Sequence, residues 1–395
     1  MSAKNDISIV SIVRGGCIAV VLLAAASAAF AYPPDPDNAA LLYYQAFLLD
    51  EQPDEATSQL LDDLVKGTIS PNDKVKEYVQ SCRSTINYAL MATEREHCNW
   101  GIVYSKGFSA ALPHLAQCRR LSKLMLADAR LLAAQGAYDE ALERCLSTKK
   151  LARHVDDGIV ISLLVAHAID ALADDCIRDI LGMTSPDPQV LQRLKGQLLT
   201  VSTPAPSFAK GLKLEQEMAL DMMRMDRLDE IMDVLKSADG STPNVLPAKV
   251  DEAFLARNRE YYERYMTALQ ATLAAPMSYE KKHAELKAMV DRMTQEVGKN
   301  PDAVLTAALV PALNRVYSIE AKAQARANAL RVGIEILIAR TQTGALPERL
   351  PTDLPKDPFS DGDYLYEKTG AGFVLRCQGK DLDKDTTYEY TFAVK

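Results

Sequence analysis

The chain has 395 residues, of which 48% are hydrophobic and 25% charged, the composition of a globular protein that can bury a sizeable core. Its formal net charge is −8, from 53 acidic and 45 basic residues, and the sequence contains no basic block. Because nucleic acids and anionic lipids attract basic surfaces, this balance argues against either as a partner.

The first residues, 1–31, have the pattern of a secretory signal peptide. Lys4 and Arg14 supply the positive start, an apolar run follows over 17–30, and a small-x-small motif ends at Ala31. The run is too short to span a bilayer comfortably, which favours cleavage over a retained anchor, and no later stretch is suited to crossing a membrane. We therefore expect a protein exported through the inner membrane, in the periplasm or cell envelope.

Seven cysteines are present, and six of them follow the expected signal. An even number outside the cytoplasm permits disulfides, and Cys82 with Cys98 is the favoured pair. The alternative is that cysteines such as Cys118, Cys145 and Cys176 are small apolar residues buried on helix faces.

Helices are expected soon after the signal. Apolar residues recur at helical spacing over 37–49 and 56–65. A further helix over 70–93 would begin with Ser70 as its N-cap and Pro71 at its first helical position.

The longest run with helical periodicity spans 121–181. Within it, Gly136 ends one helix, Tyr138 packs into the turn, and Ala141 lets the second helix come close. This turn chemistry is that of a tetratricopeptide hairpin and predicts antiparallel helical hairpins.

More helices are expected towards the C-terminus, with Pro-containing breaks between them. They cover 188–200, 209–235, 250–273, 278–297 and 300–341, with an exposed loop at 237–247 and a kink at Pro311.

Composition changes after Gly344. Prolines cluster at the start of 346–395, and alternating apolar segments such as 364–366 follow, which predicts a small antiparallel sheet. The expected fold is mainly α: a helical body at 32–299, resembling an irregular tetratricopeptide array, and a C-terminal α+β module at 300–395.

Two resemblances add to this interpretation. The tail segments are Ala329-Leu330, Gly344-Ala-Leu-Pro347, Asp357-Pro358-Phe359, Tyr364-Leu-Tyr366 and Gly379-Lys-Asp381. They resemble the globular half of the major pseudopilin of type II secretion systems, over about the last 70 residues. With Asn38-Ala-Ala40, Cys98-Asn-Trp100 and Gly136-Ala-Tyr138, the whole chain is similar to uncharacterised exported helical proteins of planctomycete-like bacteria. That family implies a location and a shape, and no established activity.

Asp381, Asp383 and Asp385 place carboxylates on alternate residues, a spacing that lets oxygens converge on calcium. The loop has Thr386 and Phe392 where an EF-hand needs Gly and Glu, which excludes that motif. The pseudopilin resemblance raises the case for calcium, because such tails commonly bind it in this region. The alternative is a solvated acidic turn. No other cofactor is expected.

Catalytic chemistry has weak support. The sequence has no G-x-S-x-G, phosphate-binding loop or His-Glu-x-x-His motif. An unrecognised hydrolase would need Glu215, Glu217, Asp221 or His97 to converge in one cavity. His97 and Cys98 are adjacent in sequence, but this does not make them a catalytic pair, because the side chains of such a pair must be in contact in the folded protein.

The other histidines, His114, His154, His167 and His283, have no i, i+4 histidine partner. We expect them at the surface or at helix ends, where the helix dipole favours a histidine near a C-terminus.

These observations favour a non-enzymatic envelope protein that binds a protein or peptide partner or acts as a scaffold, since stacked hairpins expose grooved surfaces. The expected signature is a groove lined by aromatic and amide side chains without converging titratable groups. The first alternative is a calcium-stabilised component associated with a secretion machine or filament, and the second is the hydrolase.

Overall fold

The computed structural model describes residues 33–202, 207–237, 250–310 and 313–395. The chain divides after Asp37, and the unit Asn38–Lys395 is considered below. The expected signal peptide, most of the expected loop at 237–247, and Pro311 lie outside the described residues. In the described ranges, no helix combines the length and apolar character needed to span a membrane.

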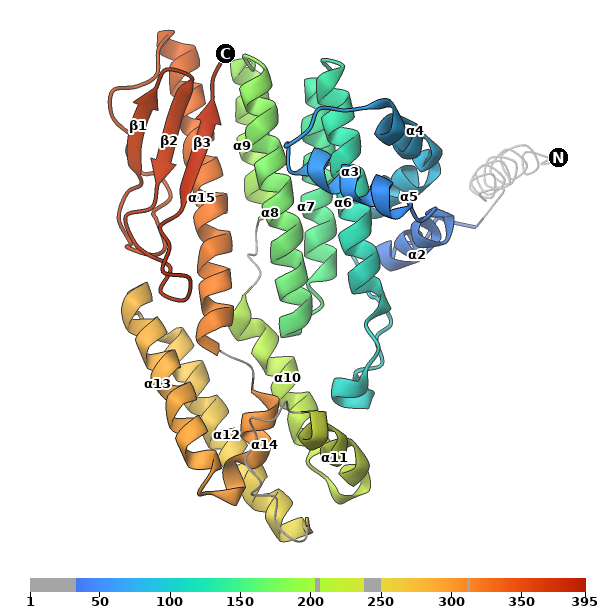
Figure 1. The fold of residues 1–395 in the computed structure, drawn as a ribbon, viewed down its shortest axis with the longest axis vertical. Helices are drawn as coiled ribbons and strands as arrows, with labels where there is room; N and C mark the ends of the chain where they lie inside the picture. The colour runs from blue at the N-terminus through green and yellow to red at the C-terminus, as the bar shows by residue number, and fades with distance from the viewer. Residues whose placement is uncertain (1–32, 203–206, 238–249, 311–312) are drawn as a thin grey trace, which may run out of the picture. The chain divides into compact units, whose positions relative to one another are not determined.

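The unit is mainly helical and ends in a small antiparallel sheet, which confirms the coarse fold expected from the sequence (Figure 1). The first helices are α2 (Ala39–Leu49), α3 (Glu55–Val65), α4 (Asp73–Ser81), α5 (Arg83–Thr93), η1 (Tyr104–Ser109), α6 (Pro113–Ala134), α7 (Tyr138–Val155), α8 (Val160–Met183) and α9 (Pro188–Val201). They are followed by α10 (Phe208–Met222), η2 (Met225–Arg227), α11 (Leu228–Ser237), α12 (Glu252–Ala274), α13 (Tyr279–Val297), η3 (Pro301–Ala303), α14 (Val304–Leu309) and α15 (Leu313–Thr343).

Side-chain caps set the starts of the early helices. Asn38 accepts a hydrogen bond from the backbone N–H of Ala40 in α2, and Asn72 accepts one from Val75 in α4. The helix predicted over 70–93 is therefore wrong in two details. It starts after Asn72 rather than Ser70, and it is interrupted at Cys82.

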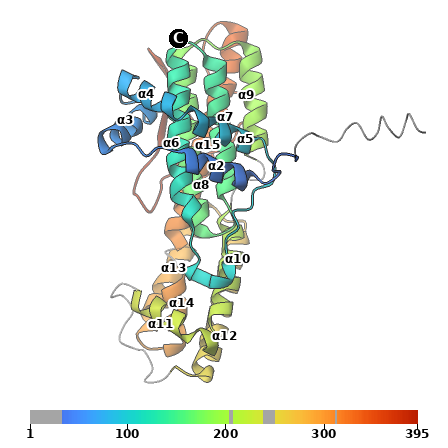
Figure 2. The ribbon, with the colours of Figure 1, turned by 90° about the vertical axis from the view of Figure 1, so that its right-hand side faces the viewer.

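Helices α6, α7 and α8 pack on one another, and α2–α5 lie across one side of them (Figure 2). Gly136 adopts a φ of +83° between α6 and α7, a conformation that glycine reaches without strain. Ala141 is fully buried at the start of α7, which allows the close helix approach expected there.

Besides the helix expected over 70–93, three others expected as single elements are divided. The second helix of the hairpin expected within 121–181 breaks between Val155 and Val160. The segment predicted over 209–235 breaks at Met223–Arg227, and the one predicted over 300–341 is split into η3, α14 and α15. Periodicity could not show these breaks because apolar residues keep helical spacing on both sides of each one.

The sheet contains β1 (Leu365–Thr369), β2 (Gly372–Arg376) and β3 (Glu389–Ala393) in the order β1-β2-β3. Phe373 pairs with Phe392 across β2 and β3, and their rings stack 4.8 Å apart. Strand β3 contacts α8 and α15. A Cβ atom on Gly333 of α15 would lie 2.3 Å from the Phe392 ring, so the absence of a side chain there lets the sheet dock.

Candidate functional site

A polar cavity of about 130 Å³ lies between α7, α8 and α15. Its wall includes the basic residues Lys149, Arg153, Arg326 and Arg331, the acidic residues Asp170, Asp174 and Glu320, and His167. Basic side chains therefore outnumber acidic ones by one.

Helical spacing on two adjacent helices brings the charges of this cavity together. Lys149 and Arg153 are four residues apart on α7, and Asp170 and Asp174 are four apart on α8, so each pair lies on one face. The Lys149 Nζ atom lies 2.6 Å from Asp174 Oδ1 and 3.2 Å from Asp170 Oδ1. Arg153 donates a hydrogen bond to Asp170 Oδ2 and another to the carbonyl of Val201.

Burial and pairing act in opposite directions on these groups. Burial alone would lower the pKa of Lys149, but Asp170 and Asp174 outweigh it and raise that pKa, so the ammonium stays charged. Burial opposes ionisation of Asp170, yet Lys149 and Arg153 lower its pKa overall. His167 is different, because burial lowers its pKa to about 4 and leaves the ring neutral near pH 7.

Two nitrogen atoms at this cavity are buried without a hydrogen-bond partner in the described part of the chain: Arg153 Nη1 and His167 Nε2. The His167 side chain is only 8% exposed. Arg331 and Gln324 are exposed on α15 and line the same cavity. Asp170 Oδ1 at the same cavity is a third buried atom without a hydrogen bond among the described residues. The wall therefore holds partnerless polar atoms of both kinds, and Arg331 places a cation where the cavity meets solvent.

No motif in the sequence pointed to this site. The usable signal was the pair of i, i+4 spacings, Lys149 with Arg153 and Asp170 with Asp174, inside an otherwise apolar helical run. Charged residues in such a run are expensive to bury unless they pair, and two matched pairs on consecutive helices indicate that they do.

The three expected calcium ligands turn towards different partners. Asp381 is 2% exposed, and its carboxylate accepts hydrogen bonds from the N–H groups of Asp383 and Lys384 and from the Tyr388 hydroxyl, the last at 2.6 Å. It therefore closes the loop before β3.

Asp383 Oδ1 accepts a hydrogen bond from Asn314 at 2.8 Å and lies 3.3 Å from His283 Nε2. Asp385 pairs with Lys380 at 2.5 Å. Among the described residues, no three His, Cys, Asp or Glu side chains are grouped so as to hold a metal ion.

Cys82 and Cys98, the favoured disulfide pair, are both free in the structure. The Cys82 sulfur lies 3.9 Å from the Ser81 hydroxyl at the α4–α5 junction. Cys98 is half-buried near the start of α2, and burial raises the pKa of its thiol to about 12. The favoured pairing therefore has no support from the structure.

The residues that a hydrolase would need, Glu215, Glu217, Asp221 and His97, lie in different parts of the structure. Glu215 accepts a hydrogen bond from the N–H of Val160 at the start of α8, Glu217 is exposed, and His97 is exposed in the loop after α5. Asp221 pairs with arginines at the end of α10. The four side chains line no common cavity in the described chain.

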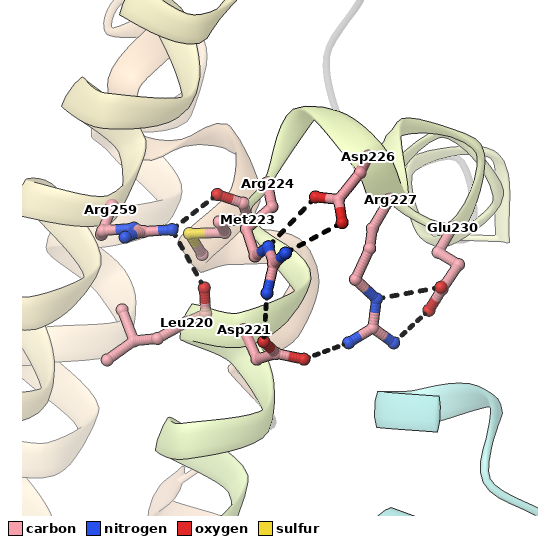
Figure 3. Close-up of polar contacts among 8 residues, drawn as sticks. All are labelled: Leu220, Asp221, Met223, Arg224, Asp226, Arg227, Glu230 and Arg259. Carbon is pink, nitrogen blue, oxygen red and sulfur yellow. Dashed lines mark hydrogen bonds and ion pairs between the residues drawn. The ribbon is translucent and has the colours of Figure 1, made fainter. Parts of the chain in front are cut away.

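Figure 3 shows the Asp221 cluster, which joins α10 to α11 through η2. Arg224 donates to both oxygens of Asp226 and to Asp221, and Arg227 donates to both oxygens of Glu230 and to Asp221. Because most of these side chains are well exposed, such ion pairs contribute little each to stability. We interpret the cluster as structural.

Arg259 of α12 extends this cluster by donating to the carbonyls of Leu220 and Met223, at 3.2 and 2.8 Å (Figure 3). These carbonyls lie in the last turn of α10, where no helical N–H follows to bond them. Arg259 therefore fastens α12 to the end of α10.

The expectation of a surface position was wrong for three histidines, although His114 does lie at a helix end, in the first turn of α6. His114, His167 and His283 are buried, with exposures of 0%, 8% and 5%. His114 stacks on Trp100 with ring centroids 4.6 Å apart, so an aromatic neighbour covers it. Sequence spacing could not reveal this because Trp100 comes from a separate loop.

Comparison with protein-family models, with characterised proteins and with solved structures finds no match to this chain. The resemblance of the tail to pseudopilins and that of the whole chain to exported helical proteins therefore rest on the residues alone.

Proposed function

We propose that this protein is a non-enzymatic binding protein of the cell envelope, and that its polar cavity receives an anionic group of a peptide or protein partner. The observation that carries the proposal is the pair of buried nitrogens, Arg153 Nη1 and His167 Nε2, that find no partner among the described residues. Arg153 Nη1 is a donor, and the neutral His167 ring donates from Nε2 in one of its two tautomers. Buried polar groups normally have partners, so two at one small cavity favour a polar occupant.

A carboxylate fits this cavity in charge and in size. Lys149, Arg153 and Arg326 are already ion-paired, the last with Asp175 outside the wall. The attraction for an anion therefore comes chiefly from the exposed Arg331, whose guanidinium matches the two oxygens of a carboxylate. A volume of about 130 Å³ accepts a group of a few heavy atoms and leaves the rest of a partner outside, near Arg331. This differs from the expected groove of aromatics and amides, because titratable groups converge here.

The helical hairpins support the same proposal. Stacked hairpins of the tetratricopeptide kind expose surfaces on which a peptide can lie, and α6, α7 and α8 form two successive hairpins. The sequence pattern of a signal peptide at 1–31 supports the envelope as the location. The pseudopilin-like tail favours the alternative, a component associated with a secretion machine.

The test measures the midpoint of thermal unfolding with acetate, with formate and with chloride at equal ionic strength. A ligand that binds only the folded state raises this midpoint. We expect the carboxylates to raise it above the chloride value, and Arg331→Ala to remove most of that rise. Arg193→Ala is the control, since Arg193 is an exposed residue of α9 that pairs with Asp139.

Two outcomes contradict the proposal: no carboxylate-specific rise in the wild type, or an equal rise in the Arg331→Ala variant. Peptides of mixed sequence with a free or an amidated C-terminus then test the nature of the partner. Binding of the free-acid pool alone supports capture of a terminal carboxylate, whereas equal binding of both pools assigns the affinity to other parts of the surface.

A further inference from the structure

His167 lies on the face of α8 that forms one side of the polar cavity. It comes three residues before Asp170 and seven before Asp174, so the three side chains share one helix face, and all of them line the cavity. The His167 side chain is 8% exposed, and its Nε2 atom has no hydrogen-bond partner in the described part of the chain. The cavity wall therefore contains a buried imidazole with one unused nitrogen.

The charges around this ring come from three helices. They are Lys149 and Arg153 on α7, Asp170 and Asp174 on α8, and Glu320, Arg326 and Arg331 on α15. Lys149 and Arg153 are ion-paired with Asp170 and Asp174, two positive charges against two negative ones. Arg326 is paired with Asp175, outside the wall. The ion-paired interior next to His167 is therefore neutral.

A neutral interior makes the entry of an anion costly. A buried charge needs an opposite charge or hydrogen bonds, and Asp170 Oδ1 is itself a buried acceptor without a hydrogen bond in the described ranges. Arg331 supplies its positive charge from an exposed position. Within the described wall, His167 is the neutral side chain that can gain a positive charge.

We propose that an anion enters this cavity together with a proton that His167 takes up, so that binding of a carboxylate strengthens as the pH falls. This inference rests on the function proposed above, since it concerns the same cavity and the same class of ligand. The imidazolium donates from Nε2 to the anion and balances its charge beside Asp170. Linkage requires the reverse effect as well: the bound anion raises the affinity of His167 for a proton by the same factor.

The size of the effect follows from the ionisation of His167. Burial lowers the pKa of this ring to about 4, below its ordinary value of 6.5, so without an anion it is mostly neutral at pH 5. If a bound anion restores the ordinary pKa, the affinity at pH 5 exceeds that at pH 7.5 by roughly 30-fold. A partial restoration gives a smaller ratio in the same direction.

The first test compares formate binding at pH 7.5 and at pH 5, with formate chosen because it stays ionised at both. The affinity is taken from the rise of the thermal midpoint with formate concentration, relative to chloride at the same pH and ionic strength. We expect tighter binding at pH 5 in the wild type and loss of this difference in His167→Gln. The exposed His97 provides the matched control, and His97→Gln should keep the difference.

Glu320 is the competing site for the proton, because burial raises its pKa and it lines the same cavity. Glu320→Gln removes the ionisation and keeps an oxygen that can accept the hydrogen bond from the Phe208 N–H. We expect this variant to retain the pH difference. If the difference disappears in Glu320→Gln and persists in His167→Gln, the proton belongs to Glu320 and the proposal is overturned.

A second test follows the proton on the ring itself. NMR of the full chain with isotope-labelled histidine rings gives the pKa of each histidine in chloride and in formate. We expect one pKa to rise from about 4 in chloride towards 6.5 in formate, for the signal that is missing from His167→Gln. If that variant does not fold, the wild-type spectra still decide, because a set of histidine pKa values unchanged by formate overturns the proposal.

The two levels of the argument fail differently. No formate-specific rise of the midpoint at either pH overturns both the proposed function and the coupling to a proton. An equal rise at pH 5 and at pH 7.5, with the histidine pKa values unchanged, leaves the proposed function in place and overturns the coupling alone.

Discussion

The ammonium of Lys149 lies 2.6 Å from the carboxylate of Asp174, and these side chains are only 2% and 4% exposed. Asp170 Oδ1 lies 3.2 Å from the same ammonium. Buried charges are tolerated only when they are paired. The relative position of α7 and α8 therefore depends on the ion pair between Lys149 and Asp174, two residues that also line the cavity. The residues of the candidate site are therefore expected to contribute to the free energy of unfolding.

Removing the cation should therefore destabilise the protein strongly. We expect Lys149→Met to lower the free energy of unfolding by about 3–5 kcal/mol, because Asp170 and Asp174 would keep buried negative charge without their shared partner. Urea unfolding followed by the fluorescence of Trp100, the single tryptophan, measures this. Adding Asp174→Leu should recover part of the loss, and a double variant no more stable than the single one would contradict the pairing.

A glycine in α15 is expected to be essential for docking of the sheet. In Gly333→Ala the new methyl would lie 2.3 Å from the Phe392 ring, so we expect a loss of about 1–3 kcal/mol from overpacking. Gly196→Ala in α9 is the matched control, because it meets nothing within 4 Å. It should be neutral or stabilise by up to about 1 kcal/mol through helix propensity. Equal effects of the two substitutions on the thermal midpoint would argue against this packing.

Stability should fall on mild acidification because of His154. Burial lowers the pKa of this histidine to about 4, below its ordinary value of 6.5. Between these values the unfolded chain binds more protons than the folded one, so stability is lost as pH falls from about 6.5 towards 4. The contribution is at most about 3 kcal/mol.

The variant His154→Gln isolates this contribution, since glutamine does not titrate and can still hydrogen-bond to the Tyr43 hydroxyl, which lies 3.0 Å from His154 Nδ1. Urea unfolding at pH 7 and at pH 5 should show a smaller difference for the variant than for the wild type. His97→Gln, at an exposed position, is the control. An unchanged pH difference in His154→Gln would show that other groups cause the acid sensitivity.

The acidic loop before β3 has a direct test for calcium. Asp381 already accepts hydrogen bonds from two N–H groups and a hydroxyl, so we expect Asp381→Asn to lower the thermal midpoint by the same amount with calcium and with chelator. A calcium-dependent rise in the wild type that disappears in Asp381→Asn or Asp383→Asn would instead establish the metal site suggested by the spacing.

The sequence by itself determined the mainly helical fold, the C-terminal antiparallel sheet, and the ends of some helices. These follow from local causes: apolar periodicity, caps such as Asn38, and glycines such as Gly136 that end helices. Periodicity was less informative at breaks such as Cys82, where the apolar pattern continues while the backbone turns.

Only the tertiary structure decided which charged and polar residues meet. Lys149 and Asp174 belong to different helices, and Asp383 faces Asn314 and His283 from two others. Such contacts depend on how the helices pack, and spacing along one chain segment carries no information about the facing segment. For the same physical reason, the sequence could only favour Cys82 with Cys98 as a disulfide, and both are free thiols in the structure.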